Sequence, residues 1–186
     1  SLPDDVVHNH PLLCRDYGWA LSLTGQLAAA DAYLRQAEAA SGSDQALLGT
    51  ILVAQAYNLR VRGDALGAIE RAQRALPLLL QDDHLSRGLV ALTLGLAHWN
   101  QSNFRDAEGA FVKADQAAQM SRNHYARMTA LSYLGMIQGV HGQLHRAAEL
   151  CRQVIQLGEQ SPTVAPAHIE LGALLYEWND LESAAL

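Results

Sequence analysis

The sequence predicts an all-α fold, a right-handed superhelix of stacked antiparallel helix pairs. Three observations predict it. A small residue recurs about every 38–40 residues, a short polar turn begins seven residues after each, and an alanine lies five residues after the start of each turn. A period of this length is typical of stacked helix-pair arrays. The small anchor residues are Gly18, Ala56, Gly95, Gly135 and Gly172.

The first helix of each unit is expected around its anchor. Apolar or small residues lie one before, at and three after the anchor, as in Tyr17, Gly18 and Leu21, and this spacing makes one stripe of a helix. Glycine in a helix interior costs on the order of 1 kcal/mol relative to alanine. Its recurrence therefore predicts that a partner helix approaches the anchor closely.

A polar turn and a second helix follow in every unit. The turns begin at Gly25, Gly63, Ser102, Gly142 and Asn179. Glycine and asparagine tolerate the left-handed backbone that ends a helix, and Asp or Asn can cap the next one. The second helices repeat an apolar or small residue at Leu34, Ala72, Phe111 and Cys151, and another one three residues later, which predicts a face that packs on the first helix.

Longer polar stretches at 41–44, 81–84, 121–124 and 161–163 separate the units and are expected to be loops or caps. The first 11 residues read as an extended lead-in. We therefore expect one helical-repeat domain over 1–186, with about five helix pairs of which the last is truncated. Because the chain stops at Leu186, inside an expected second helix, it is expected to be a fragment of a longer protein.

Composition narrows the classes of function. The net charge is −6 and the 13 Lys and Arg residues are scattered, so direct contact with nucleic acid by this segment is not expected. No apolar run is long enough for a membrane span and the first residues show no signal-peptide pattern, so neither is expected and a cytoplasmic location is the expectation. Cys14 and Cys151 fall on the core pattern and are expected to be buried, inert thiols.

The small anchor, the polar turn and the following alanine resemble tetratricopeptide (TPR) repeats. The leucine-rich run 76–80, the segment 94–97 and the segment 175–181 are similar to the sensor segment of MalT-like regulators, which are ATP-dependent LuxR-type bacterial transcription activators. The openings at 2–3, 11–12 and 19–21 are also similar to the start of that segment.

This resemblance implies a sensor in a multidomain switch. An upstream module would bind ATP, the repeats would receive a small-molecule inducer or a regulatory protein, and a downstream helix-turn-helix would contact promoters. The present chain has no phosphate-binding loop and no DNA-reading helix, so no cofactor is expected in this segment. Its expected partners are the inducer or regulatory protein and, within the same molecule, the nucleotide-binding module.

A stripe beside the packing stripe of the first helices is expected to line the inner surface of the superhelix. It is rich in large side chains, and aromatic rings with two arginines could bind a ligand that carries a carboxylate or phosphate. The alternative is that these aromatic residues only pack between neighbouring helices. The candidate groove residues are Arg15, Trp19, Tyr57, Arg60, Leu96, Trp99, Met136 and Tyr176.

No catalytic or metal site is expected. The pairs His8/His10 and His141/His145 lack a carboxylate or thiol at ligand spacing, and no nucleophile and base can be paired. The leading interpretation is the regulatory repeat domain of a MalT-like activator. The alternative is a general TPR adaptor that binds a peptide or partner helix, and a further possibility is self-association through the truncated last unit.

Overall fold

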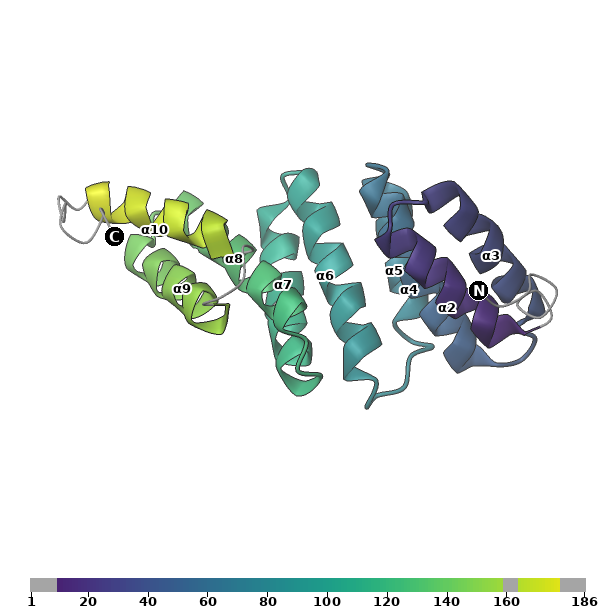
Figure 1. The fold of residues 1–186 in the computed structure, drawn as a ribbon. Helices are drawn as coiled ribbons and strands as arrows, with labels where there is room; N and C mark the ends of the chain where they lie inside the picture. Colours follow the sequence, from purple (N-terminus) through teal and green to yellow (C-terminus); the bar gives the residue numbers. More distant parts are fainter. Residues whose placement is uncertain (1–9, 159–163, 178–186) are drawn as a thin grey trace.

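A computed structural model describes residues 10–158 and 164–177, and nearly all of them are helical. Four antiparallel pairs are followed by the first helix of a fifth, and α2 and α10 lie at opposite ends of the elongated array (Figure 1). The pairs are α2 (Pro11–Leu23) with α3 (Leu27–Ala40), α4 (Gln45–Val61) with α5 (Ala65–Ala75), α6 (His84–Asn100) with α7 (Phe104–Met120), and α8 (His124–Val140) with α9 (Leu144–Leu157); α10 spans Ala165–Glu177. The predicted all-α repeat fold is confirmed.

The turns within the pairs have the backbone that the sequence predicted. Gly25, Gly63 and Gly142 have φ values of 79°, 86° and 73°, and Ser102 takes φ 57° at the corresponding place. Glycine reaches this region without a steric penalty. The predicted turn at Asn179 lies outside the described residues.

Side-chain caps begin the helices after most of these turns and loops. Asp64 and Asn103 accept hydrogen bonds from backbone N–H groups of α5 and α7, as the turn sequences predicted. In the longer loops, Asp44, Asp83 and Asn123 cap α4, α6 and α8 in the same way. These acceptors satisfy N–H groups that have no partner inside the helix.

The second helices pack on the first ones through the predicted positions. The alanines that follow the turns are buried, as are the apolar residues four positions later. Fully buried alanines let two helices approach closely, and the larger side chains then fill the space beside them. The buried residues are Ala30, Ala68, Ala107 and Ala147, with Leu34, Ala72, Phe111 and Cys151.

The anchor glycines do not all have the same reason to be glycine. A Cβ on Gly95 would lie 2.6 Å from the Phe111 ring, and one on Gly18 would lie 2.9 Å from Cγ of Leu34. A side chain at either position would therefore clash with the second helix. At Gly135 the nearest atom to such a Cβ is 3.7 Å away, an ordinary contact distance. The expectation that close approach explains each anchor glycine is therefore wrong for Gly135.

The packing of the two layers identifies the inner surface. Each first helix contacts the first helix of the next unit from α2 to α8, whereas second helices of neighbouring units barely meet. The layer whose helices lie closer together is the concave side of a curved array. We call the surface formed by α2, α4, α6, α8 and α10 the inner face.

We predict opposite effects of alanine at two anchors. Gly95→Ala should lower the free energy of unfolding by about 1–3 kcal/mol, because the new methyl overlaps the fully buried Phe111 ring. Gly135→Ala should raise it by about 0.5–1 kcal/mol through helix propensity alone. Urea denaturation of both variants measures this. Equal destabilisation by the two changes would contradict the geometric difference between the anchors.

Candidate functional site

An aromatic pair with a cation lies on the inner face at the N-terminal end. The rings of Trp19 from α2 and Tyr57 from α4 meet edge to face, with centroids 5.3 Å apart and planes at 62°. Arg60, one turn after Tyr57, places its guanidinium carbon 5.1 Å from the centroid of the Tyr57 ring. Its Nε is buried and makes no hydrogen bond to a described residue. The three residues together therefore offer an aromatic surface beside an arginine that has no ion pair with a described residue.

Arg15 lies on the same helix as Trp19 but is already engaged. Its Nη1 donates to Oγ1 of Thr50 at 3.0 Å, and its Nε lies 2.6 Å from Oδ1 of Asp16. The first contact ties α2 to α4, and the second neutralises the charge. Arg15 is thus a link between units in this structure, whereas the sequence suggested a ligand contact.

A second aromatic cluster lies near the middle of the array. The Trp99 ring, at the end of α6, is 5.1 Å from Phe104 of α7 and 5.2 Å from Tyr133 of α8, measured between centroids. Tyr133 in turn stacks on the buried Phe111 at 5.0 Å. Trp99 and Leu96 both pack against the largest hydrophobic core of the described chain. For these two residues the geometry favours the packing interpretation.

Met136 borders a small hollow on the same face. The hollow has a volume of about 270 Å³ and lies between α8 and the start of α10. Met136 is 37% exposed, and Tyr133 connects this hollow to Trp99. Its lining residues are Tyr125, Met128, Thr129, Ser132, Tyr133, Met136 and Pro166.

The eight candidate residues therefore do not form one continuous groove. The structure brings Trp19, Tyr57 and Arg60 together at one end, and it links Trp99 to Met136 through Tyr133 further along. Tyr176, at the end of α10, is 69% exposed and makes no ring contact within the described residues. Sequence reasoning missed Tyr125 and Tyr133, because both lie off the stripe that helical spacing selected.

Burial perturbs the titratable groups near α9 and α10. Desolvation raises the pKa of the Glu170 carboxyl above its usual value. Desolvation, with the Glu170 charge as a smaller cause, raises the pKa of the Cys151 thiol to about 11, and burial also raises the pKa of Cys14. Both thiols are buried as predicted, and a raised pKa keeps them in the unreactive protonated form at neutral pH.

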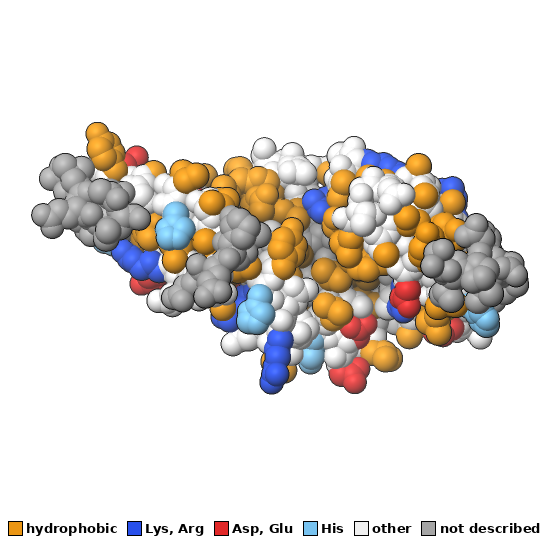
Figure 2. Space-filling model, in the orientation of Figure 1, with side chains coloured by type: hydrophobic (Ala, Val, Ile, Leu, Met, Phe, Trp, Pro, Cys, Tyr) orange, Lys and Arg blue, Asp and Glu red, His pale blue; other side chains and the backbone are white. Residues whose placement is uncertain are grey.

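The described part of the chain has neither a cluster of metal ligands nor a helix that could span a membrane. No group of three potential His, Cys, Asp or Glu ligands occurs there, although His8 lies outside it. No helix in this part is long and apolar enough to cross a membrane. On the face shown in Figure 2, basic and acidic side chains are interspersed among hydrophobic ones without a large patch of one sign.

Carboxylates on two second helices hold neighbouring units together, which the sequence analysis did not foresee. On α3, Asp31 accepts from Nδ2 of Asn58 at 2.8 Å and pairs with Arg62, and Glu38 accepts from Nε2 of Gln55 at 2.7 Å. These acids lie one and eight residues after Ala30.

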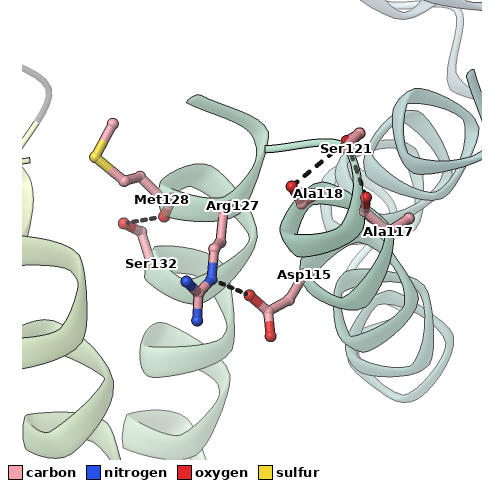
Figure 3. A network of polar contacts seen from close by, with 7 residues as sticks. All are labelled: Asp115, Ala117, Ala118, Ser121, Arg127, Met128 and Ser132. Carbon is pink, nitrogen blue, oxygen red and sulfur yellow. Dashed lines mark hydrogen bonds and ion pairs between the residues drawn. The ribbon is translucent and has the colours of Figure 1, made fainter. Parts of the chain in front are cut away.

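The same two positions on α7 also carry acids. Glu108 accepts from Nε2 of Gln138 at 2.7 Å, and Asp115 accepts from Nε of Arg127 at 3.1 Å. Figure 3 shows Arg127 of α8 reaching across to Asp115 of α7. Units one and two, and units three and four, are thus joined by polar bridges at matching places.

Comparison with known proteins assigns this chain to a family. Residues 49–186, most of the chain, match the family model of the MalT-like TPR region. The chain belongs to this family. The match begins within α4, so the first helix pair of this MalT-like TPR region lies outside it, although that pair has the same anchor, turn and packing. No match is found among curated protein sequences.

Solved structures share the fold of this MalT-like TPR region at low sequence identity. PilF from Pseudomonas aeruginosa is 21% identical with a TM-score of 0.73, covering 94% of this chain and 73% of PilF. BtubC (BKLC) from P. vanneervenii is 18% identical with a TM-score of 0.75, covering 98% and 78% respectively. A putative kinesin light chain from Podospora anserina, with TPR-like repeats, is 18% identical at a TM-score of 0.69, covering 95% and 92%. At these identities the similarity shows the fold.

We predict that Trp99 stabilises the fold. Trp99→Ala should lower the free energy of unfolding by about 2 kcal/mol, because it removes a half-buried ring from two aromatic neighbours and the core. Tyr176→Ala, at an exposed position, should change it by less than about 0.5 kcal/mol. Thermal denaturation compares the two. An unchanged melting temperature for Trp99→Ala would show that the ring does not act in packing.

We also predict a pH dependence that originates at Glu170. Because its folded-state pKa is raised, the folded protein binds this proton more tightly than the unfolded chain does. Its contribution to stability is therefore present at low pH and is lost as pH rises from the ordinary carboxyl pKa through the raised one. Glu170→Gln should raise stability at pH 7 and leave a flatter profile. If urea midpoints from pH 4 to 8 fall in parallel for wild type and variant, Glu170 is not the source; Glu177→Gln, at an exposed site, is the control.

Proposed function

We propose that this helical array is the signal-receiving segment of a MalT-like transcription activator, and that it binds an inducer or a regulatory protein on its inner face. The proposal rests on the family assignment taken together with the aromatic side chains on that face. Helical-repeat arrays present surfaces for binding and seldom catalyse reactions. The proposed function is therefore the binding of a ligand or partner.

The N-terminal cluster favours a ligand with a flat or apolar body and a negative charge. The edge-to-face rings of Trp19 and Tyr57 supply apolar area, and the half-buried Arg60 supplies a guanidinium that forms no ion pair with a described residue. A guanidinium with a free N–H can bind a carboxylate or phosphate, and burial beside the rings strengthens that contact. A small-molecule inducer or an acidic side chain of a regulatory protein meets these requirements.

The hollow beside Met136 is the second place on the inner face that a ligand could use. Its walls are mostly apolar, and Tyr125 and Ser132 add hydroxyl groups. A volume of about 270 Å³ is near the lower end for small-molecule sites, so it fits one aromatic or aliphatic group. An occupant would contact α8 and the start of α10 together.

Occupation of the inner face can act as a signal only if the ligand prefers one arrangement of the repeats. Trp19 and Tyr57 belong to different units, and so do Met136 and Pro166. A ligand at either place therefore favours one spacing of two units. In the parent protein, that spacing would set how the array packs on an upstream nucleotide-binding module, where ATP would bind, and thereby the assembly that activates transcription.

The alternative function is a general TPR adaptor that holds a peptide or partner helix without coupling to transcription. TPR clamps for a C-terminal carboxylate typically place Lys and Asn on the inner stripe, whereas this chain has Trp19 and Tyr57 where the asparagines would be expected. The similar solved structures share the fold only and do not favour the adaptor. The sensor interpretation remains the leading proposal.

The test uses the full-length parent protein and a reporter promoter that it controls. Arg60→Ala combined with Tyr57→Leu should reduce the transcriptional response at least about tenfold, because the variant loses the cation and the ring beside it, while ATP binding is retained. Arg74→Ala, at an exposed position on a second helix, is the matched control and should respond normally. A normal response of the double variant, and of a protein lacking the repeats, would contradict the proposal.

A further inference from the structure

A large hollow in the described chain lies away from the inner face. It has a volume of about 870 Å³ and lies between the second helices α5 and α7, over α6. We call it the outer hollow. None of the candidate residues from the sequence analysis lines it, and the proposed function makes no use of it.

The outer hollow exists because α5 is short. This helix has 11 residues and ends before Pro77, whereas α7 has 17 residues. Six residues correspond to about 9 Å of helix, so the last turns of α7 have no counterpart on α5. Ala117 and Met120 at the end of α7 therefore line the outer hollow.

The outer hollow also lacks the carboxylates that bridge units one and two and units three and four. The positions that hold Asp31 and Glu38 on α3, and Glu108 and Asp115 on α7, hold Ile69 and Leu76 on α5. Arg87 and Arg127 both lie eight residues before their anchors. Arg127 meets Asp115, but Arg87 meets Leu76 and, among the described residues, donates only to the carbonyl oxygens of Leu76 and Leu79, at 3.4 and 3.5 Å. Arg87 therefore occupies the same place in its unit as Arg127, but α5 has no acid at the position where α7 has Asp115.

Two more cations line the outer hollow. Arg105 and Lys113, both exposed on α7, form no ion pair with any described carboxylate. The lining contains one acid, Asp106, which accepts from Nδ2 of Asn103 at 2.7 Å. In a chain of net charge −6, this region has an excess of positive charge.

From these observations we infer that the outer hollow binds an acidic peptide segment of a partner protein. Arg105 and Lys113 are separated by eight positions on α7, or about 12 Å, so one carboxylate cannot contact both. An extended peptide rises about 3.3 Å per residue, so acids about four residues apart would match the two cations. Leu94, Ala110 and Met120 add apolar surface for the side chains between them. The segment supplies the carboxylates that α5 lacks.

The test measures the fluorescence anisotropy of a labelled peptide with the complete chain. The probe has about twelve residues, enough to span the hollow, with glutamates about four positions apart and leucines between them. A matched peptide carries glutamine for each glutamate. The glutamate peptide should bind at least about tenfold more tightly, and its affinity should fall as salt rises from 50 to 500 mM, because these exposed charges are screened.

Amino-acid substitutions in the outer hollow test whether the peptide binds there. Arg105→Glu with Lys113→Glu should weaken the glutamate peptide at least about tenfold, whereas Arg152→Glu, an exposed cation on α9 outside the hollow, should change it less than about twofold. Arg87→Leu should also weaken binding, yet it should shift the melting temperature less than Arg127→Leu, which breaks an ion pair.

Three results would overturn the inference: equal affinity for the two peptides, unchanged binding by the Arg105 and Lys113 double variant, or competition by free citrate at the same concentration as the peptide. The last result would identify a site for small anions. None of them bears on the inner face, so failure here can be distinguished from failure of the proposed sensor function.

Discussion

The contact between a first-helix anchor and the second helix that crosses it governs this structure. Gly95 lies against the Phe111 ring, and Gly18 against Leu34, at distances that leave no room for a methyl group. The close approach buries both second-helix side chains completely. Because the left-handed turn beginning seven residues later fixes the return of the chain, anchor, turn and buried alanine act as one unit. Stacking these units then creates an inner layer of first helices and an outer layer of more widely spaced second helices.

The sequence sufficed for the repeat but not for the site, and the reason is physical. Positive φ at Gly25, Gly63 and Gly142 and the burial of the alanines are local properties, which a residue's type and position determine directly. Whether Trp99 lines a groove depends on where Phe104 and Tyr133 lie, and they come from two other helices. Arg15 likewise contacts Asp16 and Thr50, and its place on the stripe does not indicate either contact. Helical spacing selects a face, but only the packing of neighbouring helices decides what that face contacts.

The bridging carboxylates show a regularity with a period of two units. Acids occupy two equivalent positions on α3 and α7, and apolar residues occupy them on α5 and α9, at Ile69, Leu76, Ala148 and Ile155. Where acids are present, hydrogen bonds of 2.7–3.1 Å fix the next unit. Charge-assisted hydrogen bonds are directional, whereas apolar contact is not, so the two kinds of junction restrain orientation differently.

This difference singles out the junction between units two and three. It is held by apolar contacts among α4, α5 and α6 and by the two long hydrogen bonds from Arg87, whereas the junctions on either side of it have carboxylate bridges. Helix α6 shares in both surfaces considered above: Leu96 and Trp99 pack on its inner side, and Arg87 and Leu94 line the outer hollow from a different side. Whereas the two inner-face sites lie between units one and two and between units four and five, a ligand in the outer hollow would contact α5, α6 and α7 and would therefore act on this junction. Because that junction has few directional restraints, small differences in ligand affinity between two arrangements of the units would suffice to shift it.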